Sequence, residues 1–232
     1  MDRLQKILFI VVIVLAVILA LVLIVGIGFY FACKSTEGLG FISKHMTPDT
    51  SLTNLEKNRI LYDMMGVFHT YTKHITVWPV YGTLLGFVRE NRIICYDYDL
   101  DFGIYEDRWN DMKIALEKLV KENPEYGYMR YDFHFMKYAQ LYHKKTMLGC
   151  DVSVYQVKNG KVIRNLLMND FKYNTEDVFP LARMIIKHHY TDEYFEFAMP
   201  ANPDAILRTC YGENYMISDH KCDDDCENCV KV

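Results

Sequence analysis

Three aspartates alternate with apolar residues in the segment "CYDYDLDFGIY", residues 95–105: Asp97, Asp99 and Asp101. Because successive side chains of an extended strand point to opposite faces, a strand here would place all three carboxylates on one face. Carboxylates this close repel one another and raise each other's pKa unless a cation or water lies between them. The pattern therefore allows either a solvated edge strand or a cation site.

A hard divalent metal fits such a site best. An EF-hand calcium loop needs Gly at its sixth position and Glu at its twelfth, and counting from Asp97 the chain has Phe102 and Arg108 there. Mg²⁺ and Mn²⁺ are instead held by one or two carboxylates while substrate phosphates complete the shell. Asp99 and Asp101 are the expected ligands, and Asp97 lies close enough in sequence to join them.

Two other segments can supply the remaining groups of a phosphate site. The segment "YGTLLGFVRE" predicts a helix entered through Gly82, whose first N–H groups and positive dipole end attract an anion. Thr83 adds a hydroxyl, and Arg89 can donate to a phosphate. Asp151, in the apolar strand pattern "GCDVSVYQV", offers a third carboxylate, since buried aspartate is rare unless paired. A plain helix cap and a loop-capping aspartate are the structural alternatives.

Helix and strand patterns alternate around these residues. Helical periodicity covers residues 51–74, 82–90, 107–123 and 203–211, and strand patterns cover 75–80, 97–102, 127–135, 137–143 and 149–157. Thr53 and Glu56 have the spacing of a capping box, and Asn159-Gly160 is typical of a hairpin turn. We expect an α/β or α+β domain over residues 51–220, large enough to bury its own core.

The N-terminal region predicts a membrane anchor. Residues 7–33 contain no charged side chain. About 20 apolar residues cross a bilayer, whereas the apolar core of a signal peptide has only about 7–15. The sequence therefore predicts a short tail (1–6), an uncleaved single-pass anchor (7–33) and a stem (34–50). A type II orientation, with the domain lumenal or otherwise outside the cytosol (Golgi or ER in a eukaryote), is expected.

The net charge and the cysteine content indicate which partners, disulfides and metal sites to expect. The net charge is −4 and no basic stripe follows the anchor, which excludes nucleic acid as a partner on electrostatic grounds. Seven cysteines are an odd count and predict no disulfide framework. The acidic tail, residues 221–232, could supply zinc ligands from Cys222, Cys226, Cys229 and the preceding His220. A disulfide or a disordered tail is favoured, because the spacing matches no standard zinc finger.

The segment "YGTLLGFVRENRIICYDYDLDFGIY" resembles the signature of the LicD/fukutin-type phosphotransferases, and it is close in motif to the fukutin-related members. The segments "VFPLARM" and "MPANPDAILRTCYGENY" resemble the later part of the same family, so the resemblance covers most of residues 60–215. It implies a nucleotidyltransferase-like mixed sheet flanked by helices. It also implies transfer of a phospho-alcohol, such as ribitol 5-phosphate or phosphocholine, from a CDP-linked donor to a glycan or glycolipid hydroxyl.

The resemblance assigns roles residue by residue. It implies a metal-binding Asp-x-Asp at Asp99 and Asp101, a preceding acid at Asp97, a third carboxylate at Asp151, and a donor-phosphate turn at Gly82, Thr83 and Arg89. Mg²⁺ or Mn²⁺ would clamp the donor diphosphate and CMP would leave, with Asp151 as metal ligand or general base. Two alternatives stay open: a nucleotidyltransferase acting on a sugar phosphate, and a non-catalytic, membrane-tethered glycan-binding protein.

Overall fold

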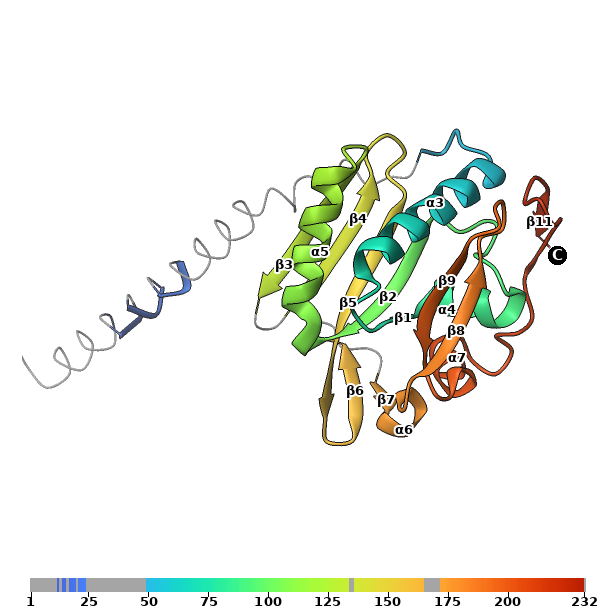
Figure 1. The fold of residues 1–232 in the computed structure, drawn as a ribbon. Coiled ribbons are helices and arrows are strands. Elements are labelled where there is room, and N and C mark those ends of the chain that lie inside the picture. The colour runs from blue at the N-terminus through green and yellow to red at the C-terminus, as the bar shows by residue number, and fades with distance from the viewer. Residues whose placement is uncertain are drawn as a thin grey trace, which may run out of the picture. The chain divides into compact units, whose positions relative to one another are not determined.

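The computed structural model in Figure 1 describes residues 12, 14, 15, 17–19, 21–23, 49–133, 136–164 and 172–231. The chain divides into two compact units, residues 1–46 and 47–232. No helix within the described ranges is long and apolar enough to cross a bilayer. The predicted tail, anchor and stem lie almost entirely outside those ranges, so the anchor stays a prediction.

A seven-stranded mixed sheet forms the centre of the second unit. Its main path runs β1 (Val77–Pro79), β2 (Asp99–Tyr105), β5 (Gly149–Lys158), β4 (Met136–His143) and β3 (Tyr126–Phe133). Two short strands extend it, with β6 (Lys161–Arg164) on β5 and β7 (Lys172–Asn174) on β6. Among the described strands only β2 and β5 pair in parallel. The predicted mixed α/β class, with helices beside the sheet, is confirmed.

Two amphipathic helices cover one face of the sheet. These are α3 (Asn54–Thr72) and α5 (Trp109–Glu122), which lie in front of the strands in Figure 1. They pack on the buried alternate positions of β2 and β5, among them Leu100, Phe102 and Val152. The predicted capping box is present, with the Glu56 backbone N–H donating to Thr53 Oγ1 at 3.2 Å. The other alternate positions, including all the aspartates of the two strands, face the opposite side.

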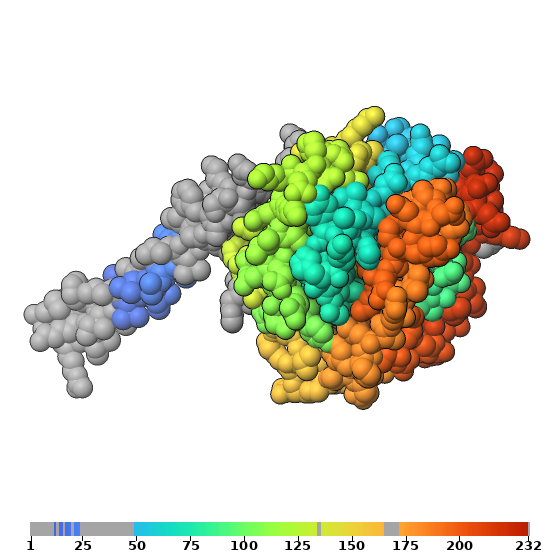
Figure 2. Space-filling view, in the orientation of Figure 1, coloured from blue at the N-terminus to red at the C-terminus, as the bar shows by residue number. Residues whose placement is uncertain are grey.

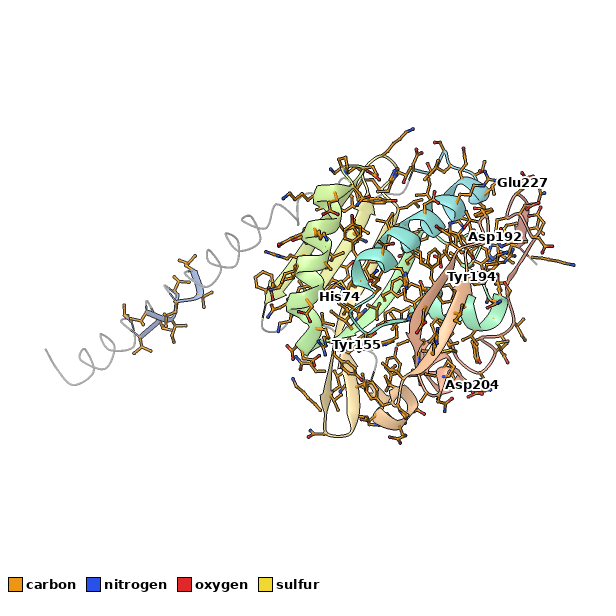
Figure 3. The ribbon with its side chains drawn as sticks, in the orientation of Figure 1. His74, Tyr155, Asp192, Tyr194, Asp204 and Glu227 are labelled. Atoms are coloured by element: carbon orange, nitrogen blue, oxygen red, sulfur yellow. A yellow bond between two sulfur atoms is a disulfide. The ribbon has the colours of Figure 1, made fainter. Side chains whose placement is uncertain are left out.

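A second core lies on that opposite side. It joins Trp78, Leu84 and Tyr155 to α4 (Tyr81–Glu90), α6 (Thr175–Val178) and α7 (Pro203–Tyr211). Figure 3 labels Tyr155, whose side chain is 1% exposed. The acidic positions of β2 and β5 therefore lie beside an apolar core, which withholds water from them.

Two hairpins follow in the C-terminal part of the chain and were not predicted. They are β8 (Ala182–Lys187) with β9 (Tyr194–Met199), and β10 (His220–Cys222) with β11 (Cys229–Lys231). A short 3-10 helix, η1 (Glu106–Arg108), joins β2 to α5. Figure 2 shows the C-terminal segment, in dark red, at one edge of the domain.

The cysteines of the tail, which were predicted as possible zinc ligands, are joined in disulfides. Cys226 is bonded to Cys95, and Cys222 to Cys229. His220 Nδ1 lies 2.8 Å from Asp219 Oδ1, and its ring lies 4.2 Å from that of Tyr96. The expectation, from the odd cysteine count, that no disulfide framework exists is therefore wrong. The Sγ atoms of Cys95, Cys222 and Cys229 lie within 4.8 Å of one another, so zinc binding here stays a prediction.

Candidate active site

The register of two parallel strands brings the predicted carboxylates together. Asp101 on β2 pairs with Asp151 on β5, and Asp99 pairs with Gly149 two residues earlier on each strand. Asp97 lies in the turn before β2 rather than in the strand, which corrects the predicted three-aspartate strand. We refer to Asp97, Asp99, Asp101 and Asp151 as the aspartate cluster.

The start of α4 is fixed against β2 by two hydrogen bonds around Asp101. The Asp101 backbone N–H donates to Thr83 Oγ1 at 2.7 Å, and the Val80 N–H donates to the Asp101 carbonyl at 3.0 Å. Thr83 is buried, and its hydroxyl oxygen, by accepting the first of these bonds, fixes α4 against the strand. Gly82 leaves room for the cluster, because a Cβ there would lie 2.9 Å from Asp97 Oδ2.

Replacing Gly82 with Ala is expected to push the Asp97 carboxylate aside and to weaken Mn²⁺ binding about tenfold, or about 1.4 kcal/mol, with little change in Tm. The matched variant is Gly86→Ala on the same helix, where the new Cβ would meet the Arg92 carbonyl at 2.6 Å. Because backbone cannot swing away, Gly86→Ala should lower Tm instead. Isothermal titration with Mn²⁺ and thermal unfolding measure both effects. Unchanged Mn²⁺ affinity in Gly82→Ala would show that the Asp97 carboxylate takes no part in binding the metal.

Two residues of β4 hold Asp151, and the sequence analysis missed both. Gln140 pairs with Asp151 across β4 and β5, and its Nε2 donates to Asp151 Oδ1 at 2.5 Å. Tyr138 pairs with Ser153 on the same face of the sheet, and its hydroxyl lowers the pKa of Asp151. Gly149 gives the amide its space, since a Cβ there would lie 2.8 Å from Gln140 Nε2. The signal that could have identified them is the predicted strand at residues 137–143, which places Tyr138 and Gln140 on the same face.

Burial raises the pKa of every member of the cluster, and neighbouring carboxylate charges raise those of Asp97, Asp101 and Asp151 further. Burial, and then the neighbouring charge of Asp99, raise the pKa of Asp97 to about 7. Burial is also the first cause for Asp151, whose pKa is raised to about 6 although Tyr138 and Gln140 lower it. The pKa of Asp101 is raised well above its usual range by burial and by the other carboxylates, and that of Asp99 is raised chiefly by burial. An oxygen-rich, partly desolvated site of this charge suits a divalent cation such as Mg²⁺ or Mn²⁺.

These shifts predict how the stability of the metal-free protein depends on pH. The folded pKa values, about 7 for Asp97 and about 6 for Asp151, lie above the unfolded value of 3.8. The folded state therefore binds more protons between pH 4 and pH 7, and the stability present at low pH is lost as pH rises through 6–7. We expect the Tm of metal-free protein to fall from pH 5 to pH 8, and Asp97→Asn to reduce that fall. A Tm profile for Asp97→Asn parallel to the wild-type profile would contradict the shift assigned to Asp97.

The arginine predicted to bind the donor phosphate is engaged elsewhere. The Arg89 side chain donates to Glu90 Oε1 at 2.6 and 3.0 Å and to the Tyr96 hydroxyl at 3.4 Å. The structure thus brings together the cluster, Gly82 and Thr83, but it pairs Arg89 with its own helix neighbour. A different cation, Arg164 on β6, lowers the pKa of both Asp101 and Asp151, and sequence reasoning did not identify it.

Comparisons with known proteins identify the family of this chain. The family described as "LicD/FKTN/FKRP, nucleotidyltransferase domain" matches residues 74–191. The uncharacterized protein RP689 of Rickettsia prowazekii is 30% identical over 214 residues, which cover 84% of this chain and 70% of that protein. RT0683 of Rickettsia typhi, also uncharacterized, is 31% identical over 134 residues, 53% of this chain and 38% of that protein. A crystal structure of ANT(2″)-Ia in complex with adenylyl-2″-tobramycin aligns with a TM-score of 0.32 and 11% identity, over 51% of this chain and 57% of that one. The matched residues include α4, β2, β5 and all four aspartates of the cluster. On the evidence of this match, the chain belongs to the LicD/FKTN/FKRP nucleotidyltransferase-domain family.

Proposed function

We propose that this protein transfers a phospho-alcohol, of the ribitol 5-phosphate or phosphocholine type, from a CDP-linked donor to a sugar hydroxyl of a glycan or glycolipid, releasing CMP. Membership of the LicD/FKTN/FKRP family supports a phosphotransferase- or nucleotidyltransferase-like role. The observation that carries the proposal is the parallel register that sets Asp101 beside Asp151, with Asp99 on the same face. Binding a glycan does not require carboxylates stacked in this way.

The cluster has the donor set of a Mg²⁺ or Mn²⁺ site. Asp99 and Asp101 would hold the ion with help from Asp97, and the bound ion would neutralise charge on the donor phosphates. Gln140 and Tyr138 keep Asp151 in one orientation, as the chemistry of a ligand or of a base requires. Its pKa of about 6 also suits a general base that accepts the proton of the acceptor hydroxyl.

Asp151→Asn separates these two roles. Loss of Mn²⁺ binding would identify Asp151 as a ligand, whereas loss of turnover with Mn²⁺ binding retained would identify it as the base.

We also propose that residues 7–33 anchor the protein in a membrane with the domain outside the cytosol. The charge-free run supports the anchor. The two disulfides support the compartment, because disulfides form and persist in oxidising environments.

A thermal-shift panel on the full chain in detergent tests the proposed function. A ligand that binds only the folded protein raises its Tm by mass action. The panel contains CDP-ribitol, CDP-choline, CDP-glycerol, UDP-sugars and nucleoside triphosphates, each with and without Mn²⁺. We expect a Mn²⁺-dependent shift confined to the CDP compounds. Shifts with triphosphates instead would favour the sugar-phosphate nucleotidyltransferase, and no shift with any nucleotide would favour the non-catalytic glycan-binding protein.

A further inference from the structure

Arg164 lies on the same side of the sheet as the aspartate cluster. It ends β6, where it pairs with Tyr155 of β5. Tyr155 lies four residues after Asp151 on the same strand, so both point to one face. Arg164 is half-buried, and its charge lowers the pKa of Asp101 and of Asp151. A permanent cation therefore faces the cluster from an adjoining strand.

This guanidinium is held by an aromatic ring and not by a carboxylate. Its central carbon lies 5.4 Å from the centroid of the Tyr81 ring. Within the described part of the chain, no carboxylate lies in ion-pair range of Arg164, in contrast to Arg89 and its partner Glu90. A ring beneath the guanidinium stabilises it while leaving its N–H edge for a planar or tetrahedral anion.

Tyr81 is itself fixed at the entrance of α4. It is the first residue of that helix and has a positive φ of 45°, an uncommon conformation for a residue other than glycine. Its hydroxyl lies 3.3 Å from that of Tyr155. The next residue, Gly82, lies directly against the Asp97 carboxylate. Tyr81 thus links the position of Arg164 to the edge of the cluster.

The balance of charges at the site indicates a role for Arg164. The ionised cluster carries four negative charges, and one divalent ion leaves two of them uncompensated. A diphosphate donor adds about two more, so its binding next to the cluster needs a further positive group. The charge of Arg164 lowers the pKa of Asp101 and Asp151, and no carboxylate among the described residues forms an ion pair with it.

We propose that Arg164, positioned by the ring of Tyr81, binds the diphosphate of the donor nucleotide in place of Arg89. This inference rests on the proposed function, since it takes the ligand to be a nucleoside diphosphate compound. It assigns the Arg164–Tyr81 pair to ligand binding and leaves Arg89 a structural role in its ion pair with Glu90.

The experiment is a titration of the full chain in detergent with CDP in the presence of Mn²⁺, and with Mn²⁺ alone. We expect Arg164→Gln to weaken CDP binding at least tenfold while Mn²⁺ alone binds as tightly as in wild type, or more tightly. Arg164→Lys should recover part of the loss, because it restores the charge without the planar fork. The matched control, Arg89→Gln, should bind CDP within about twofold of wild type.

Tyr81 supplies a second, independent readout. Tyr81→Phe keeps the ring and should leave CDP binding unchanged, whereas Tyr81→Leu should weaken it several-fold with Mn²⁺ binding retained. Wild-type affinity for CDP in Arg164→Gln, or a tenfold loss in Arg89→Gln instead, overturns the inference while the proposed function stands. Failure of the wild-type protein to bind CDP with Mn²⁺ overturns both. If Arg164→Gln does not fold, CDP binding by the two Tyr81 variants tests the inference.

Discussion

Asp101→Asn is expected to lower phosphotransfer by about 10³-fold, or about 4 kcal/mol of transition-state stabilisation, while the domain stays folded. Asp101 lies between Asp99 on its own strand and Asp151 on the next, and all three charges act on one another. Asn has nearly the same shape but carries no charge, so it cannot balance a divalent cation. The backbone N–H of residue 101 keeps its bond to Thr83, and the strand should not move.

Release of CMP from a CDP-linked donor measures the activity, and Mn²⁺ titration measures the site. Asp107→Asn is the control, because Asp107 is an exposed carboxylate in the 3-10 helix that follows the same strand. It should leave both quantities unchanged. The metal-free Asp101→Asn protein should also be more stable than wild type at pH 8, since a buried like charge has been removed. Full turnover in Asp101→Asn would refute the metal-site mechanism.

Local patterns predicted the elements that carry the site. The period-2 alternation around Asp99 and Asp101 gave β2, and the capping box at Thr53 gave the start of α3. Both signals lie within a few residues, where side-chain direction and backbone hydrogen bonding decide the conformation. The apolar strand pattern around Asp151 and the family resemblance both indicated a third carboxylate, but neither showed which residue it pairs with, because α5, β3 and β4 separate β2 from β5 in the chain. The parallel register that brings them together is a long-range property of the sheet.

The ion pair of Arg89 and the residues that the sequence analysis missed have a physical explanation. Arg89 was expected to bind phosphate, but its guanidinium donates to the carboxylate of the next residue, Glu90, at 2.6 Å. Gln140 reaches Asp151 only because the β4–β5 register sets them opposite each other. Arg164 reaches the cluster through a strand at the far end of β5. No short-range pattern in the sequence carries that information.

The Cys95–Cys226 disulfide is expected to be the largest single contributor to the stability of the C-terminal segment. Its cysteines are 131 residues apart, and constraining a loop of that length in the unfolded chain is worth up to about 5 kcal/mol. The Cys222–Cys229 bond spans only 7 residues, worth about 2 kcal/mol on the same basis. Replacing Cys95 and Cys226 together with Ala should therefore lower Tm by about 10 °C, and the matched Cys222/Cys229 replacement should cost less than half of that.

The same bond should also affect the metal site. Cys95 lies two residues before Asp97, in the turn where the Asp97 N–H donates to the Ile94 carbonyl at 3.1 Å. On the tail side, Arg92 Nη1 donates to the Asp224 carbonyl at 2.9 Å, and His189 Nε2 lies 2.7 Å from the same oxygen. Without the disulfide, these polar contacts and the ring contact between Tyr96 and His220 would hold the tail over the turn.

We therefore expect the Cys95/Cys226 variant to bind Mn²⁺ several-fold more weakly, and the Cys222/Cys229 variant to bind it as wild type does. Calorimetric titration of both double variants, read against their melting curves, measures the effect. An equal loss of Tm in the two would mean that the contacts of Arg92 and His189, and not the long-range bond, secure the tail. A lower Tm with wild-type Mn²⁺ affinity in the Cys95/Cys226 variant would mean that the Asp97 turn keeps its shape without the tail.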